Sequence, residues 1–499
     1  MPKTTGIFYS ALLLTGVNLL LRFVGTTFQV YISSVLGAGG VGLLQLVLSV
    51  GGFAMVAGTA GIRTATMYLT AEELGRKKGQ NIVWVLSGCI LYSLLCSGTV
   101  AASLYWLAPW IAEYWIGDLR TISALRLFAS FLPVNCLCGV MSGYFTAANK
   151  IRFLAAVEVA EQLCTIGVTM ATLVGWAGAD TGKACLCVII GSCCGACLTL
   201  ICLTACRIRE HPETGSQIPV RSRLLSAALP LALADILKAG INTAENLMVP
   251  KRLARNHLIA DPLASFGTVS GMVFPVLMFP ACILFGLAEL LIPELARCSA
   301  ARSKERISYL VQRSLQVAML YGVLFGGLMF LLADALCLRL YGSIEAAMQL
   351  RMYSLLIPML YCDAITDAMT KGLGQQKICV RYNILTAGLD VVFLYFLLPT
   401  YGMVGYYFSF LITHLLNFIL SIGRLLKITG EKIPFYIPAL TVAAAIGSVA
   451  VCAVLSQPVL RAGAYIVVLG CALFLLKVLS RDDLIWLKNL VQKNDLTIR

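Results

Sequence analysis

Long apolar runs separated by short polar connections make up almost the whole chain. Because about 20 apolar residues cross a bilayer as a helix, the pattern predicts fourteen membrane helices, centred near residues 20, 54, 95, 134, 163, 195, 236, 278, 322, 358, 390, 413, 446 and 469. The first run, from Gly6 to Gly42, carries Asn18, Arg22 and Gln29. Spacings of four and seven residues bring these side chains onto one helical face.

An arginine in the middle of a membrane helix is expensive, at roughly 2.5–3.5 kcal/mol on insertion scales. Arg22 therefore admits two interpretations. It either pairs with a carboxylate or extends to the interface, or it belongs to a cationic patch in a transport cavity.

Composition and charge support a polytopic membrane protein. The chain has 499 residues, of which 59% are hydrophobic and only 12% are charged, about half the charged fraction of a soluble protein. The net charge of +14 does not indicate nucleic-acid binding, because the basic residues lie in alternate short loops. This is the positive-inside pattern, and it predicts that both termini are cytoplasmic. The basic stretch Lys251–His257, on the predicted outer side, is the exception.

The two halves of the chain repeat each other. LRLFASFLP in the fourth predicted span, from Leu125, matches LRMYSLLIP in the tenth, from Leu350. Aligning the first and seventh spans more weakly places Arg22 on Lys238 and Gln29 on Glu245. Internal repeats are typical of alternating-access transporters whose site lies between the lobes.

The repeat predicts an all-α fold of two six-helix lobes around a central cavity, with two extra helices at the C-terminus. The expected parts are an N-terminal lobe (1–210), a cytoplasmic connector (211–223), a C-terminal lobe (224–430), two further spans (431–480) and an amphipathic cytoplasmic tail (481–499).

The sixth predicted span contains seven cysteines but no histidine or carboxylate that would complete a metal site. We interpret these thiols as small apolar fillers at a helix interface. No cofactor and no enzyme signature is expected, because no catalytic triad order, metalloprotease motif or phosphate-cradling loop occurs.

Polar residues within the spans are the candidate site. Arg22 and Arg63 suit a phosphate or pyrophosphate, which guanidinium groups bind in a bidentate manner. Asp235, Glu245 and Asp390 could bind a coupling cation or a proton. The full set of predicted substrate-binding residues is Asn18, Arg22, Gln29, Arg63, Glu161, Lys238, Asn242 and Glu245.

Several segments resemble polysaccharide and lipid-linked oligosaccharide flippases of the multidrug/oligosaccharidyl-lipid/polysaccharide exporter superfamily, in particular the group similar to stage V sporulation protein B and to lipid II flippases. The matching segments are NLLLRFVGTTFQVYISSVLGAGGVGLLQL, GTAGIRTATMYLTAEELGRKK, MSGYFTAANKI, the Glu161-Gln162 pair, ALPLALADILKAGINTAENLMVPKRL and ITDAMTKGLGQQK. Arg22 matches a cavity arginine of that family, whereas Gln29 stands where a second basic residue is usual and Thr165 where an arginine is usual.

The resemblance implies flipping of an undecaprenyl-pyrophosphate-linked saccharide, such as a peptidoglycan precursor or polysaccharide unit, across the bacterial cytoplasmic membrane. It also implies a sodium site, for which Asp235, Asn383 and Asp390 are the candidates. Coupling to Na⁺, H⁺ or the membrane potential remains open, as do roles in vegetative wall, spore cortex or capsule. We expect a monomer whose partners are the lipid-linked glycan and membrane lipids.

Two other functions are compatible with the sequence. A multidrug antiporter of the same superfamily would need an acid in the first lobe, and Glu161 provides one. A membrane enzyme of glycan assembly would need a sizeable outer loop with catalytic residues, and the outer connections are short.

Overall fold

The computed structural model describes residues 4–75, 81–178, 180–209, 220–431, 436–476 and 478, and the regular structure in these ranges is helical. All fourteen predicted span centres fall inside helices. The all-α prediction is therefore confirmed for the described residues. The predicted tail from residue 481 and most of the connector, residues 211–219, lie outside them.

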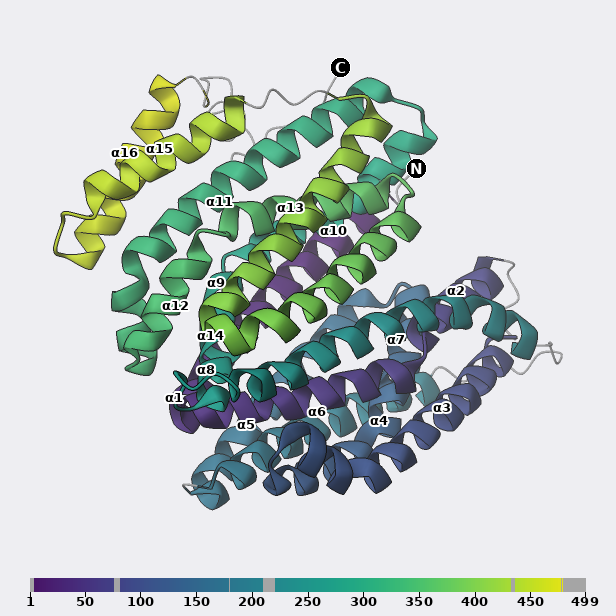
Figure 1. The fold of residues 1–499 in the computed structure, drawn as a ribbon. Helices are drawn as coiled ribbons and strands as arrows, with labels where there is room; N and C mark the ends of the chain where they lie inside the picture. Colours follow the sequence, from purple (N-terminus) through teal and green to yellow (C-terminus); the bar gives the residue numbers. More distant parts are fainter. Residues whose placement is uncertain are drawn as a thin grey trace. The chain divides into compact units, whose positions relative to one another are not determined.

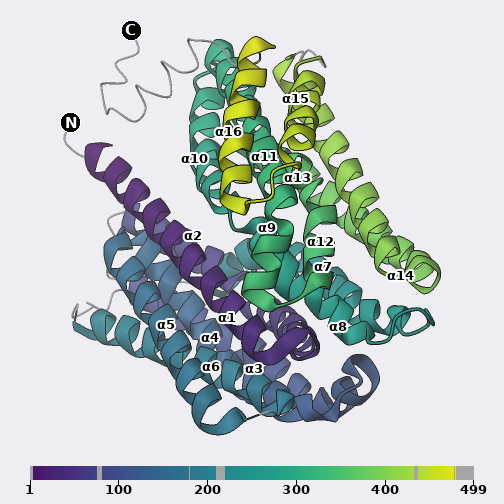
Figure 2. The same ribbon diagram turned by 90° about the vertical axis from the view of Figure 1, so that its left-hand side faces the viewer.

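The helices follow one another with short connections (Figures 1 and 2). In the first half they are α1 (Thr4–Thr59), α2 (Ile62–Gly75), α3 (Ile82–Trp110), α4 (Ile122–Ala147), α5 (Ile151–Thr172) and α6 (Thr181–Arg209). The second half contains α7 (Val220–Leu253), α8 (Pro262–Gly267), α9 (Phe274–Met278), α10 (Ala281–Ala300), α11 (Lys304–Tyr341), α12 (Ile344–Ser354), α13 (Ile357–Gly372), α14 (Gln376–Thr429), α15 (Tyr436–Cys452) and α16 (Pro458–Leu475). The π-helical turns η2 (Ile111–Ile116), η4 (Leu173–Ala177) and η5 (Thr268–Val273) extend or link these helices.

Fewer helices qualify as separate membrane spans than the fourteen predicted. By length and composition, eight described helices can cross a membrane, or nine when the bent pair 262–278 and 281–299 counts as one. Part of the difference arises because α1 and α14 each contain two predicted spans, joined only by kinks at Gly37 and Gly402. Both glycines have positive φ, which a residue without a Cβ adopts at little cost.

The remaining difference lies in three predicted spans that fall short of a continuous apolar helix. The seventh, α7, is interrupted by polar residues, the tenth is divided between α12 and α13, and α15 has only 17 residues. The protein is a multi-pass membrane protein, and the number of crossings stays a prediction.

Packing divides the chain into two compact units, one made of residues 1–275 and 383–413 and the other of residues 276–382 and 414–499. We call these unit 1 and unit 2 and describe each by itself. The division describes packing, and the boundaries of the predicted lobes remain a prediction.

The internal repeat is visible in the backbone. Left-handed residues recur at a spacing of 225 residues, at Gly117 and Gly342 and at Asn149 and Gly374. Gly178 and Gly402 continue the series one residue closer, with nearly equal φ and ψ (54° and −135°; 58° and −134°).

The arginines of the two matching motifs repeat the same contact. The Arg126 guanidinium lies 5.1 Å from the ring centroid of Tyr105, and Arg351 lies 5.8 Å from that of Phe330. Each ring precedes its arginine by 21 residues, within one unit in each case. The sequence match therefore corresponds to a repeated piece of structure.

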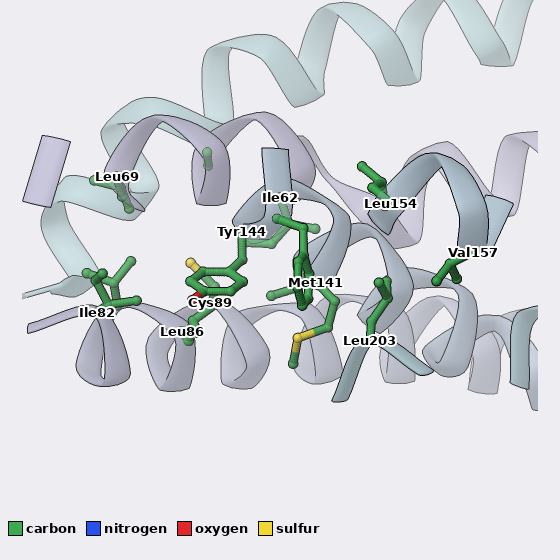
Figure 3. Close-up of a cluster of buried hydrophobic side chains, with 14 residues drawn as sticks. Ile62, Leu69, Ile82, Leu86, Cys89, Met141, Tyr144, Leu154, Val157 and Leu203 are labelled. Carbon is green, nitrogen blue, oxygen red and sulfur yellow. The ribbon is translucent and has the colours of Figure 1, made fainter. Parts of the chain in front are cut away.

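Unit 1 has an apolar core where α2, α3, α4, α5 and α6 meet (Figure 3). Ile62, Leu86, Met141 and Leu203 contribute to it from four of these helices. Fully burying a large aliphatic side chain contributes about 1.5–3 kcal/mol in water, but in lipid the gain comes mainly from close packing. This core fixes α2 and α5, which carry Arg63 and Glu161.

A glycine seam joins α1 to the α8–η5 segment in unit 1. A Cβ on Gly42 would lie 2.3 Å from the Leu263 carbonyl oxygen, and one on Gly267 would lie 2.0 Å from that of Ala38. The Ser33 hydroxyl donates to the Gly271 carbonyl across the same seam at 2.7 Å. Here the backbones touch, as small residues permit in membrane helices.

In unit 2, a buried aromatic ring takes part in the packing of α16 on α11. Tyr465 is fully buried, and its hydroxyl donates to the Val323 carbonyl at 2.8 Å. A Cβ on Gly327 would lie 2.1 Å from that hydroxyl oxygen. The glycine therefore forms the notch that receives the ring.

Candidate functional site

All eleven predicted site residues belong to unit 1. The cations among them, Arg22 on α1, Arg63 on α2 and Lys238 on α7, have exposed side chains. Asp235 and Asn242 on α7 are exposed as well, whereas Gln29 is half-buried. The side chain of Asn18 lies outside the described part of the chain.

The side-chain amide of Gln29 is a hydrogen-bond donor without an acceptor. Its Nε2 atom is buried and has no hydrogen-bond partner. Gly25, one turn earlier on α1, packs beside α5, since its Cβ position lies 3.8 Å from Nε2 of Gln162. A buried donor with no acceptor costs about 1–3 kcal/mol, so this face of α1 favours a ligand that accepts hydrogen bonds.

Two acids on α5 form the first acidic site. Glu161 Oε2 accepts a hydrogen bond of 2.7 Å from the Thr199 hydroxyl on α6. Glu158, one turn earlier, lies within electrostatic range of both Glu161 and the Arg63 guanidinium. Arg63 therefore supplies a positive charge beside this pair of acids.

A second acidic site lies between α7 and α14. Asp390 is only 6% exposed, and its Oδ1 accepts hydrogen bonds from Ser409 at 2.5 Å and from Thr413 at 3.2 Å. The carboxyl group of Glu245 contacts that of Asp390 within hydrogen-bonding distance. In the described part of the chain no lysine or arginine pairs with either acid.

Two carboxyl groups in contact away from water cannot both stay ionised without a positive charge between them. The oxygen atoms of Glu245, Asp390, Ser409 and Thr413 are hard donors, which suit a small alkali cation, and one shared proton would also satisfy the pair. The described residues contain no group of three His, Cys, Asp or Glu side chains that could hold a metal ion.

The structure brings together two of the predicted cation ligands, Glu245 and Asp390, but not the sodium set that the family resemblance implied. Asp390 is at the centre of the second acidic site. Its partner from α7 is Glu245, which the sequence interpretation named both as a possible cation ligand beside Asp390 and as a substrate-binding residue. Asp235 is exposed, three turns before Glu245 on α7, and Asn383 lies about two turns before Asp390 on α14. Neither is among the hydrogen-bond partners of Asp390.

Sequence reasoning missed the two hydroxyl residues of this site. Ser409 and Thr413 are both buried and lie four residues apart, on one face of α14 beyond the Gly402 kink. A hydroxyl pair at that spacing in an apolar helix was the available signal. The spacing alone does not show that these hydroxyl groups contact Asp390, because the contact depends on the kink at Gly402.

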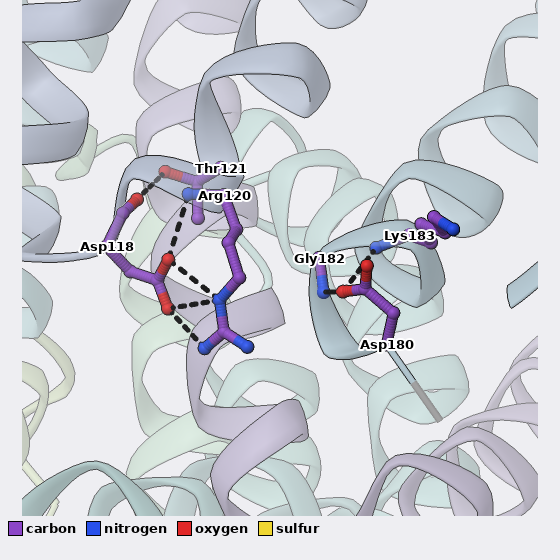
Figure 4. A network of polar contacts seen from close by, with 6 residues as sticks. All are labelled: Asp118, Arg120, Thr121, Asp180, Gly182 and Lys183. Atoms are coloured by element: carbon purple, nitrogen blue, oxygen red, sulfur yellow. Dashed lines mark hydrogen bonds and ion pairs between the residues drawn. The ribbon is translucent and has the colours of Figure 1, made fainter. Parts of the chain in front are cut away.

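Outside the spans, charges are paired in a different way (Figure 4). Asp118 lies in the turn before α4 and forms a two-point ion pair with Arg120, with a shortest N–O distance of 2.6 Å. Hydrogen bonds from the Arg120 side chain hold the pKa of Asp118 below its ordinary value. Asp180 caps the start of α6 through the Gly182 amide at 2.9 Å.

Comparison with known proteins agrees with this architecture. Residues 14–170 match the MatE family model. Stage V sporulation protein B of Bacillus subtilis (strain 168) is 21% identical over 408 residues, which cover 79% of this chain and 78% of that protein.

Two solved structures share the fold. The lipid II flippase MurJ in an inward closed conformation has a TM-score of 0.70 at 12% identity, covering 92% of this chain and 98% of that one. An inward-facing multidrug resistance MATE transporter of the MOP superfamily has a TM-score of 0.65 at 12% identity, covering 84% and 100%. The chain is therefore similar to the MatE family model over residues 14–170, distantly similar to stage V sporulation protein B, and similar in fold to MurJ and to MATE transporters of the MOP superfamily.

Proposed function

We propose that the protein flips an anionic, lipid-linked saccharide, of the undecaprenyl-pyrophosphate class, across the bacterial cytoplasmic membrane. The observation that carries the proposal is the chemistry of the first-half polar face. Arg22 and Arg63 are exposed within membrane helices, and the Gln29 amide is a donor without an acceptor. Donors without acceptors and accessible guanidinium groups favour a phosphate oxygen over an organic cation.

Alternating access between two lobes of six helices accounts for the internal repeat. In this scheme Arg22, Arg63 and Gln29 hold the head group, and Glu161, Lys238 and Asn242 line its path. The distant likeness to stage V sporulation protein B, and the fold shared with a protein described as a lipid II flippase, support the substrate class. The positive-inside pattern places both termini in the cytoplasm.

We further assign cation coupling to Glu245 and Asp390, with Ser409 and Thr413 as neutral oxygen donors. This assignment replaces Asp235 and Asn383 as partners of Asp390. Occupation of the site by Na⁺ or H⁺ cancels the repulsion between the two carboxyl groups, so the cation stabilises the arrangement in which α7 and α14 lie together.

The test is complementation of a flippase-deficient strain together with flipping of a fluorescent lipid-linked saccharide in proteoliposomes. Arg22→Ala is expected to abolish both, while membrane insertion and the elution volume on size exclusion are unchanged. Arg255→Ala is the matched control, since Arg255 is also exposed but lies in the loop after α7. Wild-type flipping by Arg22→Ala would overturn the role of Arg22.

A multidrug antiporter is the second candidate, favoured by the acidic pair Glu158 and Glu161 on α5. The two functions give opposite results in one assay. Expression of an antiporter raises tolerance to cationic dyes, and Glu161→Gln removes that tolerance, whereas a flippase leaves dye tolerance unchanged.

A further inference from the structure

The basic stretch at the end of α7 takes no part in the proposed transport mechanism. Lys251 and Arg252 lie in the last turn of α7, and Arg255 follows in the loop. By the predicted topology these cations lie on the outer side of the membrane, against the positive-inside pattern. The attraction of cations to the C-terminal end of a helix explains their place on α7, but not the contacts that hold Arg252.

Arg252 is held by an aromatic ring of unit 1. Its guanidinium carbon lies over the ring of Tyr395 on α14, 3.3 Å from the centroid. In the part of the chain that the structure describes, no carboxylate pairs with Arg252 and no acceptor takes its side-chain N–H groups. A guanidinium group that is held by its face keeps its donors at its edge, where two of them can bind the oxygen atoms of a phosphate.

The chain on both sides of Arg252 is fixed to neighbouring elements of unit 1. Lys251 Nζ donates to the Tyr114 carbonyl in η2. Asn256 is only 7% exposed, and its Nδ2 atom donates to the Thr400 carbonyl of α14 at 3.5 Å. Arg252 is therefore positioned before a ligand arrives, which lowers the entropic cost of binding.

Exposed aromatic side chains lie on the elements that hold this loop. They are Trp110 at the end of α3, Tyr114 and Trp115 on η2, and Tyr395 and Tyr401 on α14. Tryptophan and tyrosine gather at the level of the lipid headgroups in membrane proteins. The contacts of the loop with η2 and α14 therefore set Arg252 at the depth of phospholipid phosphates.

The internal repeat shows that the fold does not require an arginine over a ring at this place. In the alignment of the first and seventh predicted spans, Arg252 corresponds to Leu36, within the uncharged connection 35–41. At the repeat spacing of 225 residues, Tyr395 corresponds to Met170. Two apolar side chains stand in the first half, so the charged pair of the second half indicates a ligand.

We propose that Arg252, supported by Tyr395, binds the phosphate of an anionic phospholipid in the outer leaflet. The edge of the guanidinium group donates to two phosphate oxygens, and Lys251 adds a second positive charge one residue away. A phospholipid is favoured over free phosphate because the flanking aromatic rings place the site at the headgroup level. The site is independent of the lipid-linked substrate and of the Glu245–Asp390 pair.

Binding of a fluorescent phosphatidylglycerol to the purified full-length protein in nonionic detergent tests the proposal. Arg252→Leu is expected to weaken binding at least about tenfold, as for the loss of a hydrogen-bonded charge. Tyr395→Met should weaken it about threefold through the lost cation–π contact. Both variants introduce the residue that stands in the first half, so their elution volumes on size exclusion should match the wild type. Arg255→Leu is the matched control, because it removes an exposed cation of the same loop, and it should bind like the wild type.

Competitors identify the occupant. Unlabelled phosphatidylglycerol should displace the probe, whereas diacylglycerol with the same chains and inorganic phosphate at the same concentration should not. The proposal is overturned if Arg252→Leu binds like the wild type, or if Arg255→Leu weakens binding as much, which would indicate diffuse attraction to a basic loop. It also fails if inorganic phosphate displaces the probe, or if the lipid-linked saccharide does so at lower concentration than phosphatidylglycerol, since the site would then bind a free anion or the substrate.

Discussion

Each half of the repeat contains an acid that accepts a hydrogen bond from a hydroxyl group, but the charges beside the two acids differ. In the first half Glu161 on α5 accepts a hydrogen bond from a hydroxyl of the next helix, α6. In the second half Asp390 accepts one from a hydroxyl of its own helix, α14, beyond the Gly402 kink. At the repeat spacing Glu161 corresponds to Thr386 and Thr165 to Asp390, so acid and threonine have exchanged places one turn apart. The scaffold supplies an acid–hydroxyl contact in each half.

The halves differ in what lies beside that acid. Glu161 is near Glu158, whose charge Arg63 offsets, whereas Asp390 contacts Glu245 and pairs with no cation of the described chain. The proposed function uses this difference, since the first site contains an arginine that an anionic substrate could engage. In the same proposal the second site takes up a cation or proton from outside. We infer that the repeat has diverged into a substrate-facing half and a cation-facing half.

The substitution Asp390→Asn is expected to have the largest effect on the difference between the two halves. Neutralising one acid removes the need for an external cation, so cation-dependent flipping is expected to fall at least about tenfold, corresponding to about 1.4 kcal/mol. Flipping in proteoliposomes with and without a Na⁺ or pH gradient measures this. Asp334→Asn is the control, since Asp334 is exposed and paired with Arg351. Equal gradient dependence in wild type and Asp390→Asn would refute the assignment.

Removing the hydroxyl in the first half should affect stability rather than transport. Thr199→Val deletes the donor to Glu161, and a lost hydrogen bond to a charged group costs about 1.5–3 kcal/mol. A lower midpoint of thermal unfolding in detergent is expected. Thr204→Val on the same helix should have little effect, because Thr204 donates only to backbone carbonyls of α6. The comparison fails if Thr199→Val instead changes cation dependence.

The substitution Glu158→Gln tests whether Glu158 competes with the substrate for the Arg63 guanidinium. Without the competing carboxylate, the guanidinium is freer to bind an anionic head group, and the apparent affinity for the lipid-linked saccharide should rise about threefold, or about 0.6 kcal/mol. Titration of substrate in the proteoliposome assay measures it. An unchanged affinity would show that Glu158 and Arg63 do not compete with substrate.

The smallest effect is expected where opposite charges are already paired outside the spans. The pKa of Asp118 is lowered in the folded state from its ordinary value of 3.8. The ion pair therefore stabilises the folded protein at pH values above 3.8, and this stabilisation is lost as the pH falls through the lowered pKa. With Arg120 57% exposed, Arg120→Ala should cost only about 0.5 kcal/mol at neutral pH. Thermal unfolding of both proteins should converge at acid pH, and a constant difference would contradict the ion-pair explanation.

Hydrophobic periodicity placed all fourteen predicted span centres inside helices, because the bilayer imposes a length on each apolar run. It could not show that Gly37 and Gly402 are kinks inside longer helices, since a left-handed glycine has no distinctive spacing. It also named Glu245 and Asp390 as possible cation ligands, but it could not show that their carboxyl groups meet. Glu245 meets Asp390 through contacts between helices far apart in the chain, and no local pattern encodes such a meeting.

The glycine seam has a consequence for the order of assembly in the membrane. Gly42 belongs to the first helix of the chain, while Leu263 and Gly267 follow the seventh predicted span. The α1 surface at this seam therefore cannot pack against its partner until α8 has been synthesised and inserted into the bilayer. During synthesis the face of α1 that carries Gly42 therefore lacks its packing partner. Chaperoning of that intermediate by the insertion machinery would matter more here than for helices that pair with their immediate neighbours.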